Sequence, residues 1–213
     1  MDTRSPDVYD YVERSAEDSM RDTHTLIRYI RSLDHRREPL VQPILTPRFA
    51  LSCSRKLLAR LGSLAEKEPT LRIQTHISEN VDEVGEVLKN FKEASSYAEV
   101  YDIYGLLREN TILGHAVHLT KSEVELIKQR GAGISHCPTS NFNLNSGIAP
   151  IGYYLDRGVK VRLFGPILMK YIFIRYFLGW VRHRCFWWIL SFYTKCNSKC
   201  QHCGQSALIQ GKT

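Results

Sequence analysis

The carboxyl-terminal part of the chain contains no acidic residue. All 22 Asp and Glu of the 213-residue sequence lie between Asp2 and Asp156, whereas ten of the 29 Lys and Arg lie from Arg157 onward. The formal net charge of +7 therefore comes from the last part of the chain, and the part before it is slightly acidic. A basic surface spread over the whole molecule, as nucleic-acid-binding proteins have, is excluded.

The sequence also lacks a long uncharged apolar run. The longest such run in its aromatic region extends from Cys185 to Thr194, which is shorter than the roughly 18 residues of a membrane-spanning helix. A basic, aromatic helix lying on a membrane surface is the remaining membrane hypothesis for this region. The first residues, Met1 to Asp7, are polar and acidic rather than basic and then apolar, so no secretory leader is predicted and a cytoplasmic location is expected.

The composition changes near residue 160. Half of the aromatic residues and four of the six cysteines follow Leu163. We therefore predict two regions, a β/α region at 1–161 and a divergent, irregular, basic and aromatic tail at 162–213. Cys196, Cys200 and Cys203 have the spacing of the iron–sulfur motif of radical S-adenosylmethionine enzymes, but only ten residues follow them, so we interpret the spacing as chance.

Short β-branched runs alternate with helical stretches in the first region, which predicts parallel strands joined by helices. Strands are expected at 41–45, 71–76, 111–115, 134–136 and 159–161, and helices at 15–33, 54–67, 96–106, 120–130 and 148–157, with a further helix after Asn80. The chain is shorter than the roughly 250 residues of a complete eight-stranded barrel. The fold class is therefore α/β, a partial β/α (TIM) barrel of about five parallel strands.

Three successive strands end in histidine, and the carboxyl ends of barrel strands carry the active site. His76 can bind a divalent metal, and Glu79, three residues later, can move a proton of a metal-bound water. His115 on the next strand can hold that water or a developing oxyanion. A histidine and a glutamate satisfied by local hydrogen bonds are the alternative. The other histidines of this region are interpreted as structural (His118 and His136) or receive no role (His24 and His35).

The first strand ends near a cation and an aromatic ring. The Arg48 guanidinium matches two adjacent acceptors such as guanine O6 and N7, and Phe49 offers a face for stacking. A surface ion pair for Arg48 and a core position for Phe49 are the alternative interpretation.

Four sequence blocks carry a family resemblance. They are PILTPRFALSCS at 43–54, QTHISEN at 74–80, GH at 114–115 and SHCPTSN at 135–141. In order and spacing they resemble the guanine deaminases of the amidohydrolase superfamily, over about residues 1–161. The resemblance implies a barrel of the metal-dependent hydrolase type, a zinc-dependent hydrolysis of guanine to xanthine and ammonia, and commonly a homodimer. It implies that His76 binds zinc, Glu79 shuttles the proton, His115 orients the water, and Arg48 and Phe49 line the guanine pocket together with His76 and Glu79.

Two features of that family are missing. No His-x-His pair occurs anywhere in the chain, and no Asp follows Asp156, so three of the four expected protein ligands of the zinc are absent. Catalytic zinc sites normally use at least three protein ligands. We therefore expect a fragment that lacks part of its metal site, and the alternative is a non-catalytic fragment or an interaction protein without metal.

Overall fold

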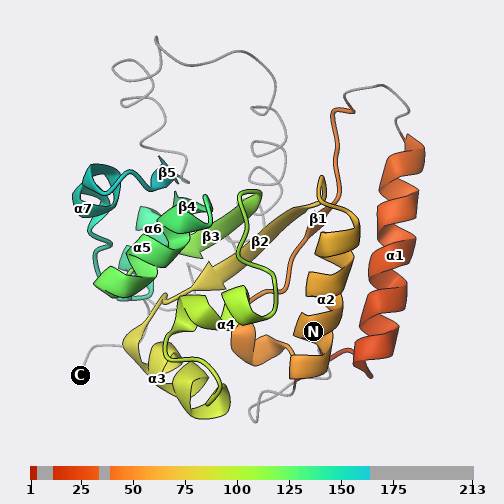
Figure 1. The fold of residues 1–213 in the computed structure, drawn as a ribbon, viewed down its shortest axis with the longest axis horizontal. Coiled ribbons are helices and arrows are strands. Elements are labelled where there is room, and N and C mark those ends of the chain that lie inside the picture. Colours follow the sequence, from red (N-terminus) through yellow and green to blue (C-terminus); the bar gives the residue numbers. More distant parts are fainter. Residues whose placement is uncertain (4–11, 34–38, 164–213) are drawn as a thin grey trace, which may run out of the picture.

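The structure is a computed structural model and describes residues 1–3, 12–33 and 39–163. Its centre is one sheet of five parallel strands in the order β1-β2-β3-β4-β5, so that each strand pairs with its neighbours in the sequence (Figure 1). The strands are β1 (Ile44–Leu45), β2 (Arg72–Ile77), β3 (Thr111–His115), β4 (Gly133–His136) and β5 (Lys160–Leu163). The predicted α/β class and the five parallel strands are confirmed.

Helices connect the strands. They are α1 (Ala16–Leu33), the 3-10 turn η1 (Ala50–Ser52), α2 (Arg55–Lys67), α3 (Val81–Asn90), α4 (Tyr97–Ile103), α5 (Lys121–Gln129), α6 (Pro138–Asn143) and α7 (Ile151–Asp156). Side-chain oxygens of Ser54, Asn80, Ser96 and Thr120 accept hydrogen bonds from backbone amides in the first turns of α2 to α5. These caps satisfy amide groups that have no partner within the helix, which explains where each helix begins.

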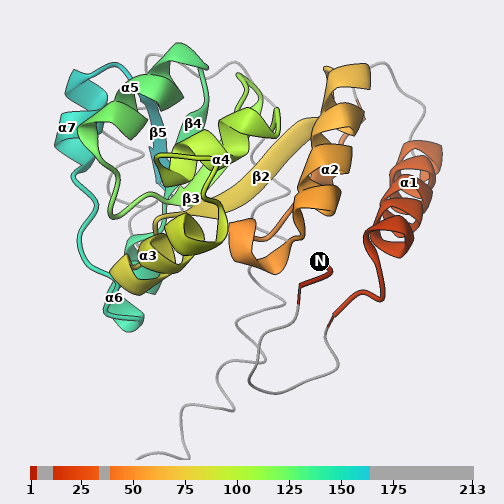
Figure 2. The ribbon, with the colours of Figure 1, turned by 60° about the horizontal axis from the view of Figure 1, so that its bottom comes forward.

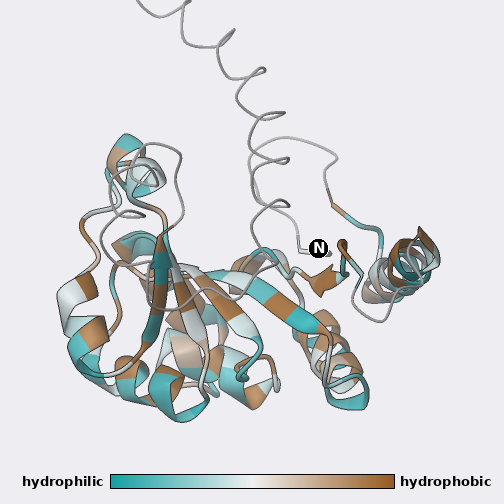
Figure 3. Ribbon diagram, turned by 90° about the horizontal axis from the view of Figure 1, so that it is seen from above, coloured by the Kyte–Doolittle hydropathy of each residue, from teal (hydrophilic) through white to brown (hydrophobic). Residues whose placement is uncertain are grey.

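Helices α2 to α5 lie on one side of the sheet, and α1 packs against α2 (Figures 1 and 3). The strand residues that face them are almost fully buried, among them Ile73, Ile77, Leu113 and Ile134. Alternate residues of a strand point to opposite faces, so the period of two in β2 and β3 places these side chains in the core beneath the helices.

The opposite face of the sheet is exposed. Gln74, Ile112, Lys160 and Arg162 lie on it, and all four are exposed. A parallel sheet in a closed barrel is covered on both faces, whereas the described residues cover one. The open face is therefore what a partial barrel leaves.

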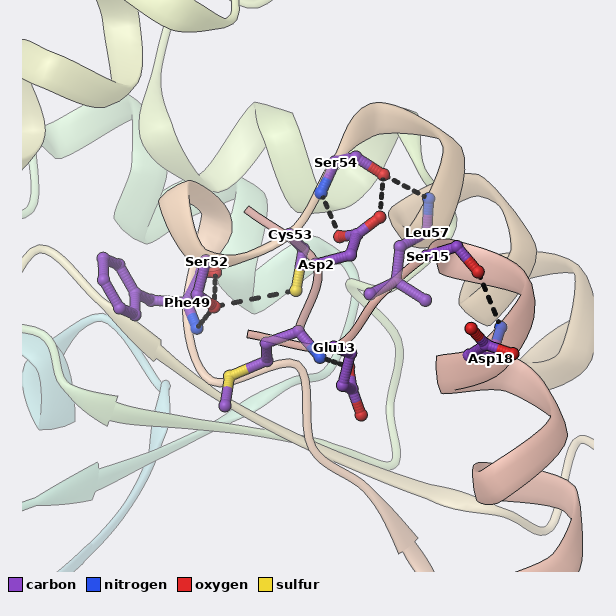
Figure 4. Close-up of polar contacts among 10 residues, drawn as sticks. Asp2, Glu13, Ser15, Asp18, Phe49, Ser52, Cys53, Ser54 and Leu57 are labelled. Carbon is purple, nitrogen blue, oxygen red and sulfur yellow. Dashed lines mark hydrogen bonds and ion pairs between the residues drawn. The ribbon is translucent and has the colours of Figure 1, made fainter. Parts of the chain in front are cut away.

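The amino-terminal residues are attached to α2 (Figure 4). The Asp2 carboxylate accepts hydrogen bonds from the backbone amide of Ser54 at 2.8 Å and from its hydroxyl at 2.6 Å. The amino group of Met1 forms an ion pair with Glu13. A carboxylate at the first turn of a helix interacts favourably with the helix dipole, so Asp2 supports α2 as well as the segment before it.

Two local expectations were wrong, and one short helix was not expected. The first strand begins at Ile44 rather than residue 41, because Pro43 has no amide hydrogen to donate to a neighbouring strand. The last helix begins at Ile151 rather than residue 148, because Pro150 disfavours a helical conformation at the residue before it. The short helix α6, which starts with a proline at its first turn, was not predicted.

Several predictions concern residues 164–213 and lie outside the described residues. They include the surface helix, the tail cysteines Cys196, Cys200 and Cys203, and most of the proposed divergent region 162–213. Among the described helices, none is long and apolar enough to cross a membrane.

Candidate active site

Two histidines face each other where β2 and β3 end. The imidazole rings of His76 and His115 are stacked, with their centroids 5.1 Å apart and their planes at 25°. The parallel register pairs His76 with Gly114 and Ile77 with His115, which brings the two strand ends to the same edge of the sheet. Figure 2 shows that α3 and α6 lie beyond this edge. The predicted meeting of His76 and His115 is therefore present.

The backbone carbonyl of Arg48 holds His76. That oxygen lies 2.9 Å from the His76 amide nitrogen and 2.6 Å from its ring Nδ1. Since a carbonyl can only accept, Nδ1 carries the hydrogen and Nε2 keeps its lone pair. Burial lowers the pKa of His76, so the ring is neutral at neutral pH. A neutral histidine with one nitrogen fixed on a carbonyl has the state in which histidines bind metals.

His115 is held by both its backbone and its ring. Its φ of 67° and that of Ala116, 51°, lie in the left-handed region, which turns the chain sharply out of β3. The Ala116 amide donates to the carbonyl of Ile77 at 3.0 Å and ties this turn to the end of β2. The His115 Nδ1 lies 2.8 Å from Oδ1 of Asn141 and 3.3 Å from Oε1 of Glu79, and the residue is 5% exposed.

Glu79 brings a carboxylate next to that ring. It follows β2 and its backbone amide donates to the Glu83 carboxylate in the first turn of α3, at 3.1 Å. Its Oε1 is buried and has no hydrogen-bond partner among the described residues. The side chain as a whole is 21% exposed. Such a carboxylate can take up and release a proton at one end of the His76 and His115 pair.

Arg48 and Phe49 lie on the other side of His76. The Arg48 guanidinium lies 5.5 Å from the centroid of the Phe49 ring, in a cation–π arrangement. Arg48 is exposed and Phe49 is half-buried. Figure 4 shows the Phe49 ring pointing away from Asp2 and Ser54. The structure thus places the Arg48 backbone directly on His76, while the Arg48 side chain has no ion-pair partner among residues 39–163.

The remaining histidines differ in their surroundings. The Nε2 of His118 lies 2.7 Å from the carbonyl of Ser146, which is a structural contact. His136 has a buried Nδ1 without a hydrogen-bond partner in the described part of the chain, and burial followed by the proximity of His115 lowers its pKa. His24 is exposed on α1, and His35 lies outside the described residues.

Asn141 is a residue of this site that sequence reasoning missed. It is 1% exposed, and the helix α6 after β4 places it on His115. The block SHCPTSN that contains it begins within the strand expected at 134–136, but nothing in its spacing indicates a contact with a residue 26 positions earlier.

The described residues do not form a complete zinc site. No group of three or more His, Cys, Asp or Glu side chains with the geometry to hold a metal ion exists in residues 1–3, 12–33 and 39–163. His76 offers one prepared ligand nitrogen, and one protein ligand is too few for a catalytic zinc.

Comparison with known proteins gives the family of this fold. The model of the amidohydrolase family matches residues 2–165. The chain belongs to the amidohydrolase family. A probable guanine deaminase of Schizosaccharomyces pombe is 53% identical to this chain over 163 residues, which are 76% of this chain and 30% of that protein. A guanine deaminase of Dictyostelium discoideum is 43% identical, over 76% of this chain and 35% of that protein.

Solved structures agree with this assignment. A guanine deaminase from C. acetobutylicum, with guanine bound in its active site, superposes with a TM-score of 0.69 at 41% identity and covers 76% of this chain and 37% of its own. An adenosine deaminase from Xanthomonas campestris with bound zinc shares the fold, with a TM-score of 0.61 at 22% identity. The chain thus spans about a third of the length of the relatives it matches.

Proposed function

We propose that this chain carries the part of a guanine-deaminating active site that binds the base and moves the proton. The observation that carries the proposal is the contact of the Glu79 carboxylate with His115, which is itself stacked on His76. Support comes from relatives that are guanine deaminases at 53% and 43% identity over the region that contains these residues.

The reaction we propose replaces the exocyclic amine of guanine by oxygen. The bond from the water oxygen to C2 forms, the bond from C2 to the amine nitrogen breaks, and xanthine and ammonia result. Glu79 takes a proton from the attacking water and passes it to the departing nitrogen, for which its unpaired Oε1 is suited. His115 orients the water for the attack.

Guanine would be bound on the β1 side of the histidine pair. The exposed Arg48 guanidinium supplies two parallel donors for O6 and N7, and Phe49, beside that guanidinium, supplies an aromatic face for the purine. His76 and Glu79 complete the pocket in this proposal. Specificity for guanine then depends on Arg48, because an adenine ring presents a donor where guanine presents O6.

Zinc is the cofactor expected for this chemistry, and the described residues supply one candidate ligand for it, His76. Activity therefore requires further ligands from outside the described residues. The second candidate function is a non-catalytic fragment or interaction protein, and the observation that favours it is the absence of a three-ligand group in the described part.

The test is the zinc content and guanine turnover of the purified 213-residue chain. If residues outside the described part of the chain supply the missing zinc ligands, we expect about one zinc per chain and release of ammonia from guanine. Glu79→Gln should then lower turnover by roughly 10²- to 10⁴-fold at unchanged zinc content. Glu86→Gln, an exposed glutamate of α3, is the matched control and should leave turnover unchanged.

Each result has a consequence. If the purified chain holds no zinc and shows no turnover, the non-catalytic candidate is favoured. Zinc with turnover that survives Glu79→Gln would refute the role of Glu79.

A further inference from the structure

Asn141 contacts His115 in a way that bears on the tautomer of that ring. A neutral imidazole has one nitrogen that donates and one that accepts, and the partner of one nitrogen decides the role of the other. The two groups nearest to the His115 Nδ1 are Oδ1 of Asn141 at 2.8 Å and Oε1 of Glu79 at 3.3 Å. Both are acceptors, so both favour a hydrogen on Nδ1.

The orientation of the Asn141 amide follows from the same neighbours. With the amide turned by half a revolution, its nitrogen would donate to a lone pair on Nδ1, and that lone pair would also face the Glu79 carboxylate oxygen. A lone pair and a carboxylate oxygen would then face each other in a site where His115 is 5% exposed. With the oxygen on Nδ1, the ring hydrogen bonds to Asn141, and Nδ1 lies 3.3 Å from the Glu79 carboxylate, so Glu79 favours this orientation although its Oε1 has no hydrogen-bond partner among the described residues.

The fold holds Asn141 in place from both sides. Its backbone amide donates to the carbonyl of Cys137 at 3.0 Å, and its own carbonyl accepts from the Ser146 amide at 2.8 Å. The shorter of the two contacts to Nδ1 is the one from Asn141, and it comes from a side chain that is 1% exposed. Glu79, by contrast, is partly exposed and is needed elsewhere as a proton carrier.

We propose that Asn141 is a positioning residue that keeps His115 in the tautomer with hydrogen on Nδ1, so that Nε2 presents a lone pair to the attacking water. This inference rests on the proposed function for the identity of the water. The tautomer itself can be measured whether or not the chain turns over guanine. Asn141 touches neither substrate nor water in this proposal, because it acts through the ring.

The experiment is nitrogen NMR of the full chain labelled with ¹⁵N-histidine. Long-range proton–nitrogen correlation distinguishes protonated from unprotonated ring nitrogens, and His115→Gln identifies the His115 signals by their loss. We expect wild-type Nδ1 to be protonated and Nε2 unprotonated. In Asn141→Leu, which has a side chain of similar size without an acceptor, we expect a shift to a mixture with the tautomer that carries hydrogen on Nε2.

Two further variants complete the design. Asn143→Leu, the same substitution at an exposed position of α6, should leave the His115 signals unchanged. Asn141→Ala removes the amide without adding bulk, so it replaces Asn141→Leu if that variant does not fold. A wild-type ring protonated on Nε2 would overturn the proposal, and so would an unchanged Nδ1–H tautomer in folded Asn141→Leu or Asn141→Ala. Absence of ammonia release from the wild type would count against the proposed function alone.

Discussion

Two glycines in helices should respond in opposite ways to the same substitution. Gly62 is buried in α2, and a Cβ added to it would lie 1.8 Å from the backbone oxygen of Tyr104 and 3.0 Å from its carbonyl carbon. Gly85 is exposed in α3, and a Cβ there would meet nothing within 4 Å. The clash at Gly62 is with backbone, which cannot rotate away as the end of a side chain can, so α2 or the segment after α4 must move.

The magnitudes follow from these two environments. Alanine stabilises a helix by about 1 kcal/mol over glycine, and this gain applies at both positions. Overpacking a well-packed region costs about 1–3 kcal/mol and sometimes more, and this cost applies at Gly62 alone. We expect Gly85→Ala to raise the free energy of unfolding by about 0.5–1 kcal/mol. A contact this close puts the cost at the upper end, so Gly62→Ala should lower the free energy of unfolding by roughly 2 kcal/mol.

Urea unfolding followed by far-ultraviolet circular dichroism measures both variants against the wild type. The sign of each change matters more than its size, because the two substitutions are chemically identical. A Gly62→Ala protein as stable as the wild type, or more stable, would refute the close approach of α2 to Tyr104. A destabilised Gly85→Ala protein would refute the open environment on α3.

Three further predictions concern stability and thiol access. Burial raises the pKa of Tyr154 to about 12 and raises that of Tyr101 as well, while an unfolded tyrosine titrates near ~10. The contribution of Tyr154 to stability is complete below ~10 and should be lost between about 10 and 12, and that of Tyr101 should fall as the pH rises above ~10. Tyrosinate absorbance during alkaline unfolding would show both. Burial raises the pKa of the Cys53 thiol, so mass spectrometry should find it unalkylated in the native chain and alkylated in urea, and alkylation in the native chain would contradict its burial. Ser54→Ala removes both the cap of α2 and a hydrogen bond to Asp2, and should lower the free energy of unfolding by about 1 kcal/mol. Ser63→Ala, at an exposed position of the same helix, is the control and should leave the free energy of unfolding almost unchanged.

The elements with strong local patterns could be predicted from the sequence. The strand Thr111–His115 has the predicted bounds, and α2 begins one residue after its predicted start at Ser54. The short helix α6 could not be predicted, because six residues are too few to show a helical period. The last part of the predicted helix 96–106 is not helical, since Gly105 has a φ of 67° after α4.

The site was predictable to the extent that strand ends define it. In a parallel sheet the carboxyl ends of neighbouring strands meet, so His76, Glu79 and His115 had to come close once β2 and β3 were recognised as neighbours. The position of Asn141 could not be predicted in this way. Its contact with His115 depends on the path of the chain through α6, and a contact of that kind leaves no periodic trace in the sequence.

The consecutive order of the strands has a consequence for how the chain folds. Ile73 pairs with Thr111, Ile112 with Gly133 and Ile134 with Val161. Each described strand therefore pairs with the strand that precedes or follows it in the sequence. The entropy lost in closing the loop between two paired strands is correspondingly modest. During synthesis, each new strand and helix can dock on an edge that the preceding unit has already formed, and we expect the order of folding to follow the order of translation.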